Sequence, residues 1–199
     1  MNSSKIRLHL INGRVGILVL LVIALVITRF HHEGTPFVLP DASLAVFFLA
    51  GLFFKGSAKV FLSLLTLAFA IDILAIYALG VSDYCWSPAY MFLVPTYAVM
   101  WLGGVILQQK SHASLSSRIV MLTGLIALST SLAFLISNGS FFWFSGKVGS
   151  VSLLDYAKGL AEGYLPYIGS TAVYVVFGLG MKALLSNLLD IRSNQSVRP

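Results

Sequence analysis

The chain has 199 residues, of which 58% are hydrophobic and only 10% are charged. Soluble domains carry about 25% charged residues, so this composition excludes a globular protein with a solvated polar surface. The net charge of +6 does not indicate nucleic-acid binding, because the basic residues are scattered between apolar segments. Long apolar runs predict an all-α, polytopic membrane protein whose outer surface contacts membrane lipid.

Six apolar segments are candidates for crossing the membrane, since a spanning helix needs roughly 20 residues. They lie at residues 14–30, 42–58, 60–80, 88–108, 118–137 and 166–187. The second contains Lys55 near its end, where the lysine stem would reach back to the interface. We predict one integral membrane domain over residues 1–199, a six-transmembrane-helix bundle with short tails. Residues 152–164 are expected to form a separate, short interfacial helix.

The basic residues indicate an orientation. If the N-terminus faces the cytoplasm, ten of the thirteen Lys and Arg residues lie in cytoplasmic segments. These are Lys5, Arg7, Arg14, Lys55, Lys59, Lys110, Arg118, Lys182, Arg192 and Arg198. Cytoplasmic loops carry an excess of such residues, so both termini are predicted to be cytoplasmic. The outer segments are longer and rich in aromatic and acidic residues, which favours an outward-facing pocket.

Asp72 is the acidic residue that lies well inside a predicted span. A carboxylate in hydrocarbon costs roughly 2.5–3.5 kcal/mol on insertion scales. No basic residue is expected at a comparable depth, and Arg29 is assigned to the outer segment. Asp72 is therefore predicted to line a polar cavity or to hold a residue that does. A structural hydrogen bond to a neighbouring helix is the alternative.

Cys85 is the single cysteine and lies in a polar, aromatic turn between the third and fourth predicted spans. One cysteine excludes an internal disulfide and a multi-thiolate metal cluster. A thiolate is nevertheless a soft ligand for a transition metal. The neighbouring Asp83 is expected to raise the pKa of the thiol, whereas metal coordination would deprotonate it. An inert, small apolar side chain is the alternative interpretation.

Histidine and aromatic residues gather on the predicted outer side. His31 and His32 follow the first span, either as an interfacial flank or with one of them facing the site. The aromatic residues are Tyr77, Tyr84, Trp86, Tyr90, Phe141, Phe142, Trp143, Phe144, Tyr156, Tyr164 and Tyr167. An interfacial belt explains most of them. Their number on one side also suits the walls of a pocket for a large, flat, partly apolar ligand.

Three stretches resemble a small bacterial membrane family: HHEGTPFVLPDASLA at 31–45, SDYC at 82–85 and SNGSFFWF at 137–144. They are similar to the solitary cobalamin-transporter family (BtuM), which is related to S-components of energy-coupling-factor transporters. The most specific element is an aspartate in the third span, a cysteine in the next outer loop and a tyrosine five residues later. Here these are Asp72, Cys85 and Tyr90. The resemblance covers residues 14–187.

The resemblance implies an S-component-like bundle in the bacterial inner membrane with an outward-facing cobalamin pocket. It implies that the Cys85 thiolate coordinates cobalt, with the nucleotide base displaced, and that cyanide is lost from cyanocobalamin. Tyr84, Trp86 and Trp143 are expected to pack against the corrin. His32 is a second candidate near the cobalt, and His31 a further neighbour.

The first span departs from related S-components, because it lacks the small-xxx-small pattern through which helices dock closely. A dedicated coupling subunit is therefore not expected, and the protein would act alone. Two other interpretations remain open from the sequence. One is a haem-binding subunit of an electron-transfer system that uses Cys85 and a histidine as axial ligands. The other is a membrane scaffold whose cysteine is incidental.

Overall fold

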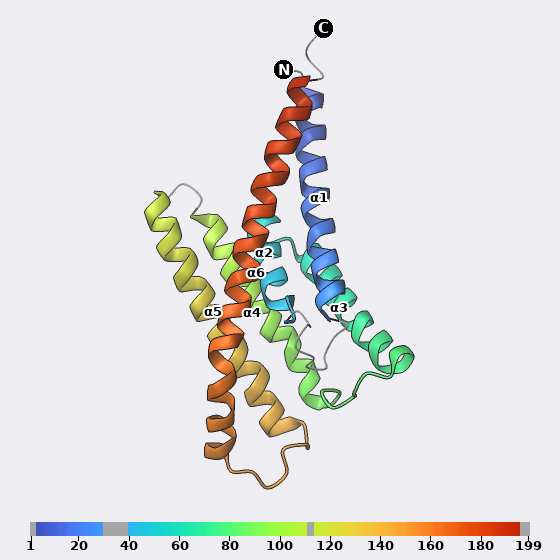
Figure 1. Ribbon diagram of the computed structural model, residues 1–199, viewed down its shortest axis with the longest axis vertical. Helices are drawn as coiled ribbons and strands as arrows, with labels where there is room; N and C mark the ends of the chain where they lie inside the picture. The colour runs from blue at the N-terminus through green and yellow to red at the C-terminus, as the bar shows by residue number, and fades with distance from the viewer. Residues whose placement is uncertain (1–2, 30–39, 111–113, 196–199) are drawn as a thin grey trace.

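The computed structural model describes residues 3–29, 40–110 and 114–195, with side chains at 13–29, 40–110 and 114–188. Within these ranges the chain is helical and has no strand. The elements are α1 (Ser3–Arg29), α2 (Ser43–Phe53), α3 (Ala58–Leu79), the 3-10 helix η1 (Pro88–Phe92), α4 (Leu93–Gln109), α5 (Leu115–Phe144) and α6 (Leu153–Gln195). Figure 1 shows them as an elongated bundle.

Within the described residues, four helical segments are long and apolar enough to cross a membrane. They are Ala58–Leu79, Pro88–Gln109, Leu115–Phe144 and Leu153–Leu188. Large apolar side chains lie exposed along them, for example Leu62 on α3, Leu128 on α5 and Val173 on α6. Such apolar faces are unfavourable in contact with water and favourable in contact with lipid chains. The described part of the chain therefore has the character of a helical membrane protein with four candidate spans.

The second predicted span, residues 42–58, is not reproduced as a full span. α2 has 11 residues, which correspond to about 16 Å at a rise of 1.5 Å per residue. It ends before Lys55 and Gly56, whose φ angles of 53° and 71° are incompatible with a right-handed helix. Its residues from Ser43 to Gly51 are all buried. A helix that is apolar on all sides suits a protein interior, so α2 fills the bundle.

The first predicted span and the interfacial helix also differ from expectation. α1 begins at Ser3 and contains 27 residues. Its side chains are described only from residue 13. α1 is not among the four candidate spans. The predicted helix at 152–164 is continuous with the last span in α6. The Ser152 hydroxyl caps the start of α6, because it accepts from the Asp155 amide at 3.2 Å. Pro166 lies inside this helix without ending it.

The helices are arranged so that the start of α1 and the end of α6 lie at one end of the molecule (Figure 1). α1 and α6 pack side by side, and Gly16 of α1 faces the side chain of Leu185 of α6. The segment between α3 and α4 and the turn between α5 and α6 lie at the opposite end. The segment between α3 and η1 at this end carries Tyr84, Cys85 and Trp86.

The closest helix contact, between α2 and α4, depends on glycine. A Cβ added at Gly104 would collide with the carbonyl oxygen of Phe48, and one at Gly51 would collide with the carbonyl oxygen of Trp101. Small residues allow membrane helices to approach this closely. The contact places Tyr97 of α4 beside Phe47 of α2, with their rings stacked at 4.3 Å.

Gly104→Ala is expected to destabilise the fold, since overpacking of a close contact costs typically about 1–3 kcal/mol. The measurement is the midpoint of thermal unfolding in detergent. Gly124→Ala on α5 is the matched control, because a Cβ there meets nothing within 4 Å. Equal midpoints for the two variants would contradict the close α2–α4 contact.

Candidate functional site

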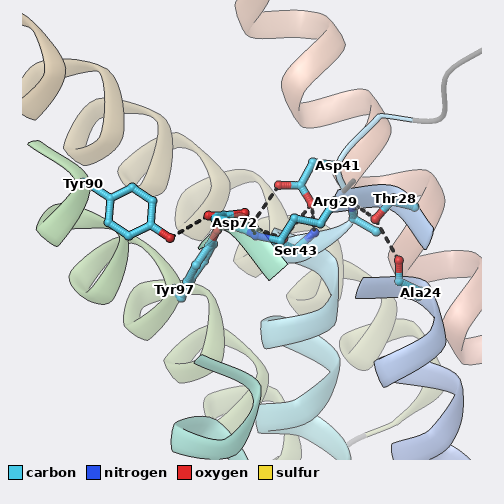
Figure 2. A network of polar contacts seen from close by, with 9 residues as sticks. Ala24, Thr28, Arg29, Asp41, Ser43, Asp72, Tyr90 and Tyr97 are labelled. Atoms are coloured by element: carbon cyan, nitrogen blue, oxygen red, sulfur yellow. Dashed lines mark hydrogen bonds and ion pairs between the residues drawn. The ribbon is translucent and has the colours of Figure 1, made fainter. Parts of the chain in front are cut away.

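A buried ion pair joins α1 to α3. Arg29, the last residue of α1, is 2% exposed. Its Nε donates to Oδ1 of Asp72 at 2.7 Å and its Nη2 donates to Oδ2 at 2.6 Å, as Figure 2 shows. This is the bidentate geometry that makes arginine–carboxylate pairs strong. The expectation that Asp72 has no basic residue at its depth is therefore wrong. Hydropathy placed Arg29 in an outer segment, but the end of α1 packs against the inside of the bundle.

Arg29 also binds the start of α2 and the first part of α4. Its Nη1 donates to the Ser43 hydroxyl at 2.7 Å, to the Tyr97 hydroxyl at 2.7 Å and to Oδ2 of Asp41 at 3.3 Å. Oδ1 of Asp41 accepts from the amide and the hydroxyl of Ser43 at 2.9 and 2.6 Å. Arg29 therefore ties α1, α2, α3 and α4 together through one polar cluster (Figure 2).

Tyr90 of η1 connects this cluster to a cavity that both of them line. Its hydroxyl donates to Oδ2 of Asp72 at 2.6 Å, which fixes the position of the tyrosine ring. Asp72 therefore lines the cavity, holds another residue that lines it and also bonds to the neighbouring helix α1.

The cavity has a volume of about 520 Å³. Its polar end, here called the floor, is formed by the buried Arg29, Asp72 and Tyr97 and by Asp41, whose side chain is 38% exposed. Its mouth is formed by the exposed Ser82, Tyr84 and Cys85. The aromatic side chains along its walls are Tyr84, Trp86, Tyr90, Phe141 and Tyr156. The mouth lies on the connection between α3 and η1, away from the start of α1 (Figure 1).

The structure brings together five of the side chains selected from the sequence: Asp72, Tyr84, Cys85, Trp86 and Tyr90 all line the cavity. Trp143 does not, and is 68% exposed. It is two residues beyond Phe141, which rotates it by about 200° around α5, to the opposite face from the cavity. His31 and His32 lie outside the described residues.

Several lining residues were not singled out in the sequence analysis. Arg29, Asp41 and Tyr97 form most of the floor, and Asn138 lines the wall beside Phe141. One signal for Arg29 was available, because an intramembrane carboxylate usually pairs with a cation. The identity of that cation depends on how α1 packs against α3.

The turn that carries Cys85 is fastened to the α5–α6 turn. Lys147 donates to the Asp83 carbonyl at 3.2 Å, and its ammonium lies 5.3 Å from the centre of the Tyr84 ring. The Tyr84 ring also contacts Phe141, with 5.4 Å between the ring centres. Burial raises the pKa of the Cys85 thiol, Asp72 raises it further, and Lys147 lowers it. The causes of the raised pKa are therefore burial and Asp72, and not Asp83 as expected.

We expect alkylation of Cys85 by iodoacetamide to accelerate only above the ordinary pKa of a cysteine. A raised pKa keeps the thiol protonated, and the thiolate is the nucleophile. Lys147→Met removes the charge that opposes this shift, so the midpoint of the rate–pH profile should move to a higher pH. Lys158→Met is the matched control, because Lys158 is 68% exposed and pairs with Asp155. Identical midpoints for Lys147→Met and the wild type would show that Lys147 does not act on the thiol.

Comparison with known proteins leaves the family open. No protein-family model matches the chain, and no curated protein matches it. The resemblance to cobalamin transporters thus stays a prediction from the sequence. The function has to be argued from the cavity, its thiol and its charged floor.

Proposed function

We propose that this protein binds cobalamin from the outer side of a bacterial inner membrane and mediates its uptake. The observation that carries the proposal is the position of Cys85, at the mouth of an open cavity with aromatic walls. Ligand cavities typically measure about 300–1,000 Å³. A cavity of about 520 Å³ encloses part of a ligand as large as cobalamin, and the remainder lies over the mouth.

The chemistry of the donor set supports a corrinoid rather than a bare metal ion. Among the described residues no group of three His, Cys, Asp or Glu side chains could hold a metal. Cys85 alone therefore suits a metal that brings its own equatorial ligands, as cobalt does in a corrin. The flat, partly apolar corrin would pack against rings such as Tyr84, Trp86 and Phe141.

In the proposed reaction the Cys85 sulfur replaces the nucleotide base as an axial ligand of cobalt. The thiol loses its proton to solvent, and the sulfur donates an electron pair to the metal, which overcomes the raised pKa. Cyanide on the opposite face leaves with its own bonding pair as an anion. Cobalt remains trivalent throughout, so decyanation needs no external oxidant or reductant.

We further propose that α1 crosses the membrane beside the four candidate spans, with the short α2 packed between them, and that both termini lie in the cytoplasm. The side-by-side position of the start of α1 and the end of α6 supports this (Figure 1), as does the distribution of Lys and Arg. Reporter fusions at Asn2 and Pro199 test the orientation. Periplasmic activity from either fusion would contradict it.

The use of Gly16 supports a protein that acts without a dedicated coupling subunit. A Cβ at this position would lie 2.8 Å from a methyl group of Leu185. This small residue of α1 therefore packs against the end of a side chain of α6 within the chain. Membrane helices use such small residues for close contacts.

Titration of the purified protein with cyanocobalamin and, separately, with haemin tests the proposal. We expect the corrinoid to co-elute with the protein and its visible bands to shift on binding. Haem binding without corrinoid binding would favour the electron-transfer interpretation. Among the described residues that line the cavity, however, no histidine is available to pair with Cys85. Binding of neither ligand would favour a scaffold.

A further inference from the structure

The floor of the cavity carries more negative than positive charge. The charged side chains among the described lining residues are Arg29, Asp41 and Asp72, one cation and two anions. We infer that this floor selects corrinoids whose ring side chains end in amides over those whose side chains end in carboxylates. The inference rests on the proposed function and names the substrate class within it.

Arg29 is not free to receive an anionic ligand. All three of its guanidinium nitrogens donate to protein oxygens, on Asp72, Ser43, Tyr97 and Asp41. The residue is 2% exposed. A ligand carboxylate at the floor would have to displace one of these acceptors. It would also lie beside two aspartates, and like-charge juxtaposition disfavours binding.

Asp41 offers the acceptor that a ligand amide can use. Its Oδ1 already accepts from Ser43 at 2.6 and 2.9 Å. From the described residues its Oδ2 receives one contact, from Arg29 at 3.3 Å, which is longer than the usual range of about 2.7–3.2 Å for such bonds. The side chain is 38% exposed. A carboxylate oxygen has two lone pairs, so Oδ2 retains the capacity to accept from a primary amide N–H.

The neighbouring sequence does not supply a compensating lysine or arginine. Residues 30–39, which precede Asp41 and lie outside the described residues, read FHHEGTPFVL and contain neither Lys nor Arg. At the mouth, the Lys147 ammonium is engaged with the Asp83 carbonyl and the Tyr84 ring. The preference for amides is therefore assigned to the floor, with Asp41 as its determinant.

The test compares two corrinoids on the full-length protein in detergent. One is dicyanocobinamide, whose ring side chains end in amides, and the other is dicyanocobyrinic acid, whose side chains end in carboxylates. We expect the wild type to bind the first at least about tenfold more tightly. Asp41→Asn should lower this ratio several-fold, because it removes one of the two floor anions. Asp155→Asn, an exposed Asp outside the cavity, is the matched control and should keep the ratio.

The outcomes separate this inference from the proposed function. Equal affinities of the wild type for the two corrinoids would overturn the inference and leave cobalamin binding intact. A preference that survives in Asp41→Asn would overturn the assignment to Asp41. Failure of the wild type to bind either corrinoid would overturn both. The wild-type ratio needs no variant, so the inference is tested even if Asp41→Asn does not fold.

Discussion

Arg29→Met is expected to destabilise the protein strongly. It would leave the Asp72 carboxylate buried without the guanidinium that now donates to both of its oxygens. Removing one partner of a buried ion pair typically costs about 3–5 kcal/mol, because the remaining charge is uncompensated. The measurement is tryptophan fluorescence during heating of the purified protein in detergent.

Two further variants identify the cause of that loss. Arg14→Met, at an exposed position on the same helix, is the matched control and should melt close to the wild type. Arg29→Gln combined with Asp72→Asn removes both charges and should recover part of the stability, since no buried charge is then left unpaired. If Arg29→Met and Arg14→Met melt at the same temperature, the ion pair does not hold the bundle together.

Two of the four candidate spans, Ala58–Leu79 and Pro88–Gln109, could be predicted closely from the sequence. The span predicted at 60–80 is α3, Ala58–Leu79, and it ends at Gly80, whose φ of 68° suits a glycine cap. Long apolar runs with clear ends are what hydropathy detects. It does not distinguish a lipid-facing run from a buried one, so the short, fully buried α2 was predicted as a complete span.

The site was predictable where its residues are neighbours in sequence. Tyr84, Cys85 and Trp86 belong to one turn, and a turn at the mouth of a bundle places its side chains near one another. The partner of Asp72 was not predictable, because Arg29 lies 43 positions earlier and the pair forms only when α1 packs on α3. Trp143 lies outside the cavity for a different reason, since the rotation of α5 presents Phe141 to the cavity instead.

Cys85→Ser is expected to abolish the effect of the protein on bound cyanocobalamin. Serine keeps the size of the side chain but replaces a soft sulfur donor with a hard oxygen. Cys85→Ala removes the donor altogether and controls for weak ligation by the serine oxygen. Both variants should fold normally, because Cys85 is exposed. Part of the corrinoid affinity should survive through the aromatic walls of the cavity.

The most direct measurement is a titration of wild-type and Cys85→Ser protein with cyanocobalamin, in which the visible bands and the released cyanide are followed together. For the wild type, we predict shifted bands and stoichiometric cyanide release. For Cys85→Ser, the bands should remain those of the free vitamin, without cyanide release. If the two proteins give the same bands and the same cyanide release, Cys85 does not ligate cobalt, and the proposed role of the cavity mouth is wrong.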